Sequence, residues 1–212
     1  MGAHIGYFSV IAGCKVGAEG RVLAFEPMPE TFEILTENAR LNGFEHVRCI
    51  QAAVSDTPTT AIMQTRVDEV GDAFSTLGSL GNSAAVRQVE VQCIKLDDYL
   101  GNNSIDRVHL MKVDVEGWET QVFRGATELL SAPDAPALIV EFSDYIAQQA
   151  GGSTQALRAQ IESFGYELYI YDFTRRELVY DPRSSWSTTI SSQSRISSTL
   201  AAVFLRVLDK AS

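Results

Sequence analysis

The hydrophobic pattern of this chain alternates between segments typical of helices and segments typical of strands. Residues 5–16 are apolar and rich in small side chains, which predicts a helix that packs against a sheet. Residues 22–26 then predict a strand. A second helix is expected from Pro29, because apolar residues recur at helical spacing as far as Asn42 and Gly43, a pair typical of a helix end.

The rest of the chain continues this alternation and ends with two strands that no helix separates. Further helices are expected from just after Gly117 to Leu130 and over residues 154–164. Further strands are expected over residues 47–54, 89–94, 108–113, 137–142, 166–173 and 201–207. Strands that alternate with helices predict an α/β fold with a mostly parallel, doubly wound sheet, and the closing strands predict an antiparallel C-terminal hairpin at one edge. We expect a single domain over residues 1–212.

Two segments depart from the alternation. The pattern loosens over residues 55–87, where Met63 is a candidate strand residue, and residues 68–87 are rich in small and polar side chains. A loop of that length inside a compact domain is typically a lid, a binding loop or disordered, and we interpret residues 68–87 as a lid over an acceptor. A Ser-rich stretch over residues 184–198 predicts mobile surface.

Composition and charge narrow the function. Of the 212 residues, 45% are hydrophobic and 21% are charged, as in ordinary globular domains. The net charge of -10 argues against a nucleic-acid partner, which needs a concentrated basic surface, so a small or neutral partner fits better. Cys14, Cys49 and Cys93 lie in apolar segments and are expected to be reduced thiols. No segment has the pattern of a membrane span or a signal peptide, so we expect a soluble, cytoplasmic protein.

The first chemical signal is a glycine loop at the start of the chain. The loop runs from Gly2 to Gly6, and Glu26 ends the strand that follows the first helix. Glycines let the backbone approach a nucleotide, and an acid at that strand end accepts hydrogen bonds from ribose hydroxyls. Helix packing is the alternative for the glycines, and a solvent-facing strand end is the alternative for Glu26. Such a loop normally follows a buried strand, whereas here Met1 alone precedes it, so we expect the first strand to be missing.

This loop and three later motifs resemble one known family. The motifs are Phe25-Glu26-Pro27, then Lys112-Val113-Asp114-Val115-Glu116-Gly117 with Glu119 and Gly125, and finally Val140-Glu141-Phe142. Together they look like the FkbM family of S-adenosylmethionine-dependent methyltransferases, with a resemblance that covers residues 2–171. The resemblance implies a Rossmann-like class I methyltransferase sheet and methylation of hydroxyl oxygens on sugars, polyketides or other natural products. The chain departs from the family where the first strand and its acid are absent, and where His4 replaces a common asparagine.

The resemblance also implies a binding site for S-adenosylmethionine. The glycine loop would run along the methionine part of the cofactor, with two aromatic residues beside it, while Glu26 would hold the ribose. Ser55 and Asp56 would lie by the adenine, and a polar turn is the alternative for this pair. The residues expected to bind the cofactor are Gly2, Ala3, His4, Gly6, Tyr7, Phe8, Glu26, Pro27, Ser55, Asp56 and Asp114.

The candidates for catalysis lie at the ends of the fourth and fifth strands and are Asp114, Glu116, Glu141 and Lys112. Asp114 and Glu116 follow a strand that in this sheet order lies beside the missing first strand, where ligands bind. Two carboxylates held close together cannot both ionise freely, so one has a raised pKa suited to proton abstraction. Capping of the next helix is the alternative for both residues. Glu141 ends the fifth strand inside an apolar run, and Lys112 is its expected partner.

A metal is possible in this site but not favoured. His46 is expected in a loop and His109 in the core, and neither belongs to a recognisable metal-binding spacing. An all-oxygen site from Asp114, Glu141 and Asp144 is the open alternative, because some small-molecule O-methyltransferases place a divalent cation at equivalent strand ends.

The leading hypothesis is therefore methyl transfer to a small-molecule hydroxyl, with Asp114 as the base. One alternative is an inactive or incomplete methyltransferase-like fragment, because a missing central strand leaves backbone groups unpaired on both of its neighbours. Another is an NAD-dependent oxidoreductase, which the glycine spacing disfavours because the dinucleotide loop normally reads GxGxxG. The acceptor and the oligomeric state are not predicted.

Overall fold

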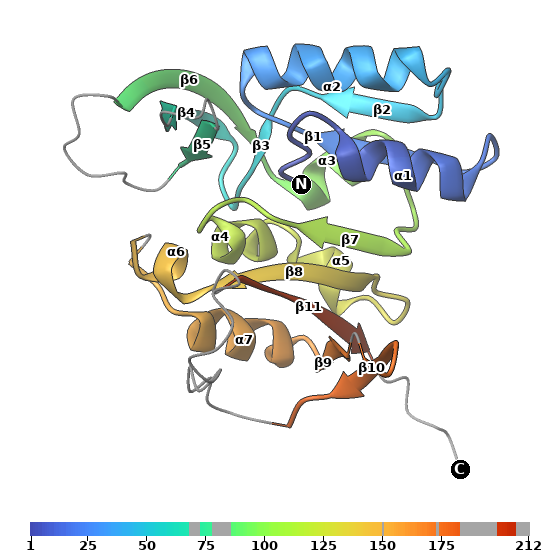
Figure 1. The fold of residues 1–212 in the computed structure, drawn as a ribbon, viewed down its shortest axis with the longest axis vertical. Coiled ribbons are helices and arrows are strands. Elements are labelled where there is room, and N and C mark those ends of the chain that lie inside the picture. The colour runs from blue at the N-terminus through green and yellow to red at the C-terminus, as the bar shows by residue number, and fades with distance from the viewer. Residues whose placement is uncertain (68–72, 78–85, 150, 173, 183–198, 207–212) are drawn as a thin grey trace.

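The strands among the residues that the structure describes form three sheets, with the N-terminus between two of them (Figure 1). The computed structural model describes residues 1–67, 73–77, 86–149, 151–172, 174–182 and 199–206. Most of the predicted lid, residues 68–87, and the predicted mobile segment, residues 184–198, lie outside the described residues. Within the described part of the chain, no helix is both long and apolar enough to cross a bilayer.

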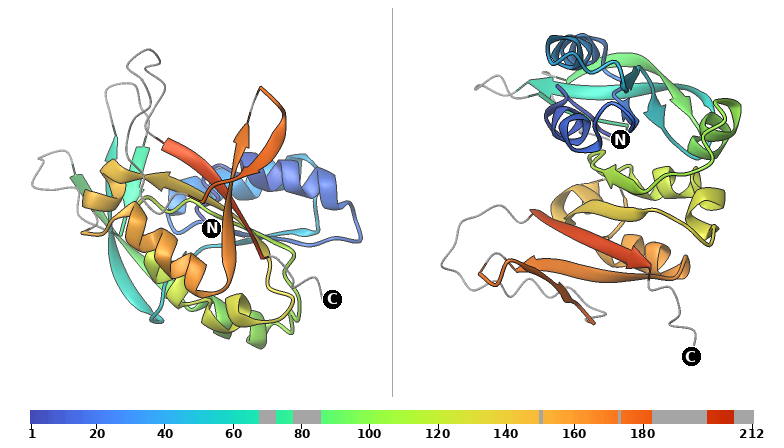
Figure 2. Two further views of the ribbon diagram at one scale, coloured as in Figure 1. Left: turned by 90° about the horizontal axis from the view of Figure 1, so that it is seen from below. Right: turned by 90° about the vertical axis from the view of Figure 1, so that its right-hand side faces the viewer.

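A two-stranded parallel sheet forms the N-terminal part of the fold. β1 (Val22–Phe25) pairs with β2 (Val47–Ile50), and Val22 lies opposite Val47. α1 (Tyr7–Val16) and α2 (Pro29–Leu41) lie beside this sheet (Figures 1 and 2). Both helices begin and end close to the predicted positions, because their glycine and proline boundaries are local signals.

A five-stranded sheet forms the C-terminal part, in the order β10-β9-β11-β8-β7. Its pairing is parallel between β7 and β8 and antiparallel elsewhere. The helices α4, α5 and α7 lie along it (Figures 1 and 2). The elements are α3 (Leu96–Asn102), β7 (Leu110–Val113), α4 (Glu119–Arg124), α5 (Thr127–Ser131), β8 (Ala137–Ser143), α6 (Asp144–Gln149), α7 (Thr154–Ser163), β9 (Tyr166–Asp172), β10 (Glu177–Tyr180) and β11 (Thr199–Arg206).

The closing strands are antiparallel as predicted, but they are not the edge of the sheet. β11 pairs with β9 and also with β8, so it lies inside the sheet, and β10 forms the edge as the second strand of a hairpin with β9. The expected mostly parallel sheet is likewise wrong in detail. Among the described strands, parallel pairing is restricted to β1–β2, to β7–β8 and to the pair of β3 (Ala53–Val54) with β6 (Val86–Ile94).

The third sheet combines parts of the predicted strands over residues 47–54 and 89–94 with the segment around the candidate strand residue Met63 and with part of the predicted lid. β3 (Ala53–Val54), β4 (Thr59–Val67), β5 (Ala73–Thr76) and β6 (Val86–Ile94) pair in the order β3-β6-β4-β5. The predicted strand over residues 47–54 is therefore two strands, β2 and β3, which belong to different sheets. This four-stranded sheet of β3, β4, β5 and β6, called the small sheet below, buries its own apolar cluster around Met63, Val91 and Cys93.

The two-stranded sheet and the five-stranded sheet meet through the first residues of the chain. The backbone nitrogen of Met1 donates to the carbonyl oxygen of Lys112 on β7 at 2.8 Å, and the N–H of Ala3 donates to Phe25 on β1 at 3.0 Å. No strand pairing joins β1 to β7 within the described residues. Residues 1–3 therefore position the ends of β1 and β7 on either side of one site.

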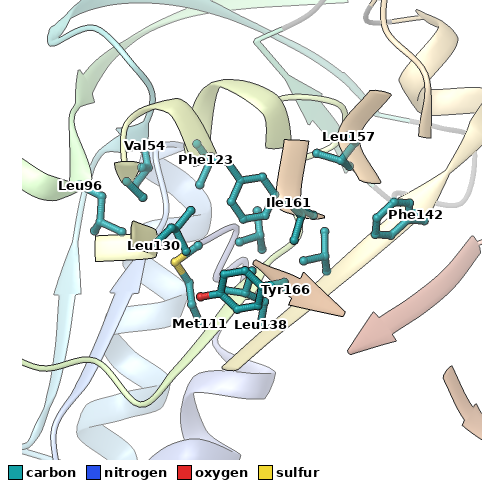
Figure 3. Close-up of a cluster of buried hydrophobic side chains, with 14 of the residues drawn as sticks. Val54, Leu96, Met111, Phe123, Leu130, Leu138, Phe142, Leu157, Ile161 and Tyr166 are labelled. Atoms are coloured by element: carbon teal, nitrogen blue, oxygen red, sulfur yellow. The ribbon is translucent and has the colours of Figure 1, made fainter. Parts of the chain in front are cut away.

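The main hydrophobic core lies between the five-stranded sheet and its helices (Figure 3). Phe123 and Leu130 from the helices and Leu138 from β8 are fully buried there, and Ile161 enters from α7. Burial of side chains of this size contributes about 1.5–3 kcal/mol each. This core holds the carboxyl ends of β7 and β8 in place.

The predicted helix from Gly117 to Leu130 is broken at Gly125. This residue is buried between α4 and α5, and a Cβ atom there would lie 2.1 Å from the carbonyl oxygen of Ser55. The close approach requires glycine, and it joins the helical segment to the backbone that follows β3.

We predict that Gly125→Ala destabilises the fold by about 1–3 kcal/mol, because the added methyl group has to displace backbone. Gly101→Ala is the matched control, since it lies in α3 and nothing lies within 4 Å of its Cβ position. We expect Gly101→Ala to keep or raise stability, because alanine favours a helix over glycine. Urea unfolding of the two variants measures the difference. Equal stability would show that the Gly125 contact is not required.

Candidate active site

A cavity of about 390 Å³ lies where the glycine loop meets the ends of β1 and β7. This volume is in the range of sites for small molecules and cofactors. The chain brings most of the predicted residues to its walls. Those that line it are Gly2, Ala3, His4, Tyr7, Phe8, Glu26, Pro27, Lys112, Asp114 and Glu116.

The glycine loop lies directly against the backbone after β7. Gly2 has a φ of +65°, and a Cβ atom there would lie 1.7 Å from the carbonyl oxygen of Asp114, so a larger residue cannot fit. Gly6 does not line the cavity. It has a φ of +94° and faces Leu35 of α2, so it helps helix packing rather than forming the wall.

Glu26 is a buried carboxylate that holds the loop and the end of β1 together. It is 6% exposed, and its oxygens accept the backbone N–H of His4 at 2.9 Å and of Met28 at 3.0 Å. Burial raises the pKa of Glu26, and the two hydrogen bonds offset part of that rise. The alternative of a solvent-facing strand end is therefore wrong.

The predicted adenine residues Ser55 and Asp56 do not line this cavity. Ser55 is buried and accepts a hydrogen bond from the indole Nε1 of Trp118 at 3.2 Å. The wall beside it is apolar instead, because Ala52, Ala53 and Val54 face the cavity together with Met63 and Leu77 of the small sheet.

Asp114 is the centre of the acidic group at the end of β7. Its Oδ2 lies 2.7 Å from the Nζ of Lys112, and it also shares a hydrogen bond with Glu141. Burial acts to raise the pKa of Asp114, but the hydrogen bonds from Glu141 and Lys112 outweigh it and hold the pKa below its ordinary value. The predicted pairing of Lys112 with Glu141 is wrong, because Lys112 and Glu141 each form a hydrogen bond with Asp114 instead.

Glu141 lies behind the main cavity rather than in its wall. It lines a small hollow together with Asp114, Glu116 and Glu119. Burial, with the hydrogen bond and the charge of Asp114, raises the pKa of Glu141 to about 8. At neutral pH the pair therefore holds one proton, with Glu141 as the protonated partner and Asp114 as the carboxylate.

Glu116 faces the main cavity in an unusual backbone conformation. Its φ is +52°, and its carbonyl oxygen accepts the Thr76 hydroxyl at 2.7 Å. Burial, with the charges of Asp114 and Glu119, raises the pKa of Glu116 to about 7. The small sheet thus contacts the acidic loop through Thr76.

Glu119 holds the acidic loop in shape, a role that the sequence motif did not reveal. It is buried, and its Oε1 accepts the backbone N–H of Val115 at 3.2 Å and of Gly117 at 3.3 Å. Helix α4 has Trp118 at its N-cap with no side-chain capping bond. The alternative that Asp114 and Glu116 cap this helix is therefore not supported.

The described residues include no group of three His, Cys, Asp or Glu side chains arranged to hold a metal. The side chain of Asp144 lies outside the described part of the structure, so that member of the all-oxygen alternative is untested. His109 is exposed just before β7, where a core position was expected, and His46 contacts the carbonyl oxygen of Gly13 at 3.0 Å.

Three curated proteins are similar to part of this chain. It is 28% identical over 139 residues to "Methyltransferase 1" of Beauveria bassiana (strain ARSEF 2860), an alignment that covers 58% of this chain and 55% of that protein. It is 28% identical over 153 residues to "Methyltransferase sdnD" of Sordaria araneosa, covering 60% of this chain and 59% of that protein. It is 25% identical over 134 residues to "Hexuronic acid methyltransferase AglP" of Haloferax volcanii, an alignment that covers 62% of this chain and 50% of that protein.

The chain thus spans between one half and three fifths of the length of these relatives. No solved structure matches it. The family comparison covers more of the chain than any of these alignments, and it includes the glycine loop, the acidic loop after β7 and the Glu141 strand. Because the model of the Methyltransferase FkbM domain matches residues 1–168, the chain belongs to the FkbM methyltransferase family.

Proposed function

We propose that this chain is an S-adenosylmethionine-dependent methyltransferase that methylates a hydroxyl oxygen of a sugar or another small natural product. The observation that carries the proposal is the shared cavity of the glycine loop, the buried Glu26 and the ionised Asp114. These three features come from distant parts of the sequence. A cavity with an acid for the ribose on one wall and a base on the other fits methyl transfer.

The strand order supports a Rossmann-like class I methyltransferase sheet. β2 and β1 lie on one side of residues 1–3, and β7, β8, β11 and β9 follow on the other. In the proposed arrangement residues 1–3 stand where the first strand would lie. Ligands of such sheets bind beyond the carboxyl ends of the strands, which is where the cavity opens.

The residues present fit the cofactor. The contact between Gly2 and Asp114 leaves a cradle that a side chain would fill, and Glu26 reaches the cavity with a carboxylate that has further acceptor capacity. The apolar wall of Ala52, Ala53 and Val54 suits a flat base. When bound, S-adenosylmethionine supplies a methyl group on a positively charged sulfur.

Asp114 is the proposed base for the acceptor hydroxyl. It is ionised, it lines the cavity, and Glu141 and Lys112 hold its carboxylate in a defined position. A positioned base contributes about 10²–10⁴ to the rate. Alignment of the acceptor contributes the larger part, because well-oriented reactions reach effective molarities of about 10⁵–10⁸ M.

A sugar is one candidate acceptor. The relative from Haloferax volcanii is named a hexuronic acid methyltransferase, and this name supports a sugar-like acceptor at modest similarity. The lid over residues 68–87 stays a prediction, and so does the cytoplasmic location.

Binding of S-adenosylmethionine is the first test of the proposal. We expect calorimetric titration to show one site, and we expect the melting temperature to rise with S-adenosylmethionine but not with NAD. Stabilisation by NAD instead would favour the oxidoreductase alternative. A folded chain that binds neither would favour the inactive fragment, an alternative that the absence of strand pairing between β1 and β7 in the described residues keeps open.

We predict that Asp114→Asn slows turnover by about 10²–10⁴ and weakens cofactor binding far less, because the amide cannot accept the proton. Asp106→Asn is the control, since Asp106 is an exposed acid between α3 and β7. Turnover number and calorimetric affinity are measured for both variants. Unchanged turnover in Asp114→Asn would remove Asp114 as the base.

We predict that turnover rises with pH through about 8 in the wild type. Below this pH the protonated Glu141 donates a hydrogen bond to the Asp114 carboxylate, which lowers the pKa of Asp114 and makes it a weaker base. As pH rises through the raised pKa of Glu141 that hydrogen bond is lost, and Asp114 becomes a stronger base. Glu141→Gln should abolish this rise, because its amide keeps donating at every pH. Glu116 adds a separate change near pH 7, so the two profiles are compared over pH 6–9.5 by initial rates. A rise retained in Glu141→Gln would exclude this role for the pair.

A further inference from the structure

The ammonium group of Lys112 lies on the face of an aromatic ring inside the cavity wall. Its Nζ is 4.5 Å from the ring centroid of Phe8 and 2.7 Å from Oδ2 of Asp114. Aromatic faces and carboxylates are both groups that bind cations in proteins. Lys112 is therefore bound by groups that also suit a charged ligand.

Phe8 is not held in this place by the protein core. Its side chain is 55% exposed at the start of α1, and its only ring partner among the described residues is Tyr7, at a centroid distance of 5.2 Å. Both rings line the cavity. An apolar ring in such a position has little to gain from core packing, and its contacts in the described structure include the Lys112 ammonium and the Tyr7 ring.

We propose that Phe8 and Asp114 form a cation seat that Lys112 fills in the unloaded protein, and that Lys112 thereby sets how well the site distinguishes the charged sulfonium cofactor from its neutral thioether product. This inference rests on the proposed function. It assigns Lys112 to ligand discrimination rather than to proton transfer.

The physical basis is repulsion between like charges in a small space. A cavity of about 390 Å³ has dimensions near the ~8 Å Debye length of physiological salt, so screening between charges on its walls and in its interior is weak. The Lys112 ammonium therefore disfavours a sulfonium in the cavity. It has no such effect on the thioether that remains after methyl transfer, because that product carries no charge on sulfur.

The partly exposed position of the ion pair allows Lys112 to move. The side chains of Lys112 and Asp114 are 24% and 28% exposed, and the lysine stem is long and flexible. Loss of the ammonium leaves Asp114 without its cationic partner, which makes the seat more negative. Both effects favour the sulfonium over the thioether.

The test is calorimetric titration of the wild type and of Lys112→Met with S-adenosylmethionine and with S-adenosylhomocysteine. We expect Lys112→Met to raise the ratio of the affinity for S-adenosylmethionine to the affinity for S-adenosylhomocysteine by about 3- to 30-fold. This range corresponds to the repulsion between two unit charges that are separated by about the width of the cavity. Lys112→Arg keeps the charge and should keep the ratio within about twofold of wild type. A purely structural ion pair would lower the melting temperature of Lys112→Met and leave the ratio unchanged, which would overturn the inference.

A second variant tests the seat from its aromatic side. Phe8→Leu keeps an apolar side chain at an exposed position and removes the ring face, so the ratio should fall, opposite to the change in Lys112→Met. Ile11→Ala on the same helix is its control, because Ile11 is exposed and does not line the cavity. An unchanged ratio in Phe8→Leu would exclude the seat even if Lys112→Met failed to fold. Absence of binding of either ligand to the wild type would instead remove the proposed function itself.

Discussion

The site depends on the contact of residues 1–3 with the strands on either side of them. Met1 donates to Lys112 on β7, Ala3 donates to Phe25 on β1, and the Cα of Gly2 lies against the carbonyl of Asp114. Because these contacts are made by backbone atoms, they set the distance between the two strand ends whatever side chains follow. Glu26 and Asp114 therefore reach one cavity although they lie far apart in the sequence.

Charge within the site is organised around Asp114. Burial favours the neutral form of the surrounding acids, Glu26, Glu116, Glu119 and Glu141, and raises the pKa of each. Asp114 alone in this group has a lowered pKa, since it receives hydrogen bonds from Lys112 and Glu141. The result is one stable carboxylate among acids with raised pKa values, of which Glu116 at about 7 and Glu141 at about 8 exchange protons near neutral pH. This arrangement is suited to accepting a proton at a defined atom.

The small sheet, which has its own apolar cluster, contacts both the cavity and the acidic loop. Met63 and Leu77 line the cavity, and Thr76 donates to the backbone of Glu116. The conformation of the acidic loop therefore depends on β5 from outside and on Glu119 from within. Through the hydrogen bond of Thr76, a change in the conformation of the small sheet affects the residues at the end of β7 directly.

The sequence by itself determined most of the helices and strands, the family and many of the residues that line the cavity. α1, α2, β1, β8 and α7 follow from apolar spacing with glycine, proline and serine boundaries, which act through neighbours along the chain. Residues of the glycine loop, with Glu26 and Asp114, were recognised because their motifs are local too. Periodicity shows that a segment is buried but not which segment covers it.

Only the tertiary structure decided the pairings and contacts made through space. It placed β3 in a different sheet from β2, inserted β11 between β8 and β9, and formed β5 within the predicted lid, paired with a strand around the candidate strand residue Met63. It gave Lys112 and Glu141 a common partner in Asp114, and it moved Ser55 and Asp56 away from the cavity wall. A strand's partner and a carboxyl's pKa both depend on groups brought close by folding, and the order of residues does not contain those distances.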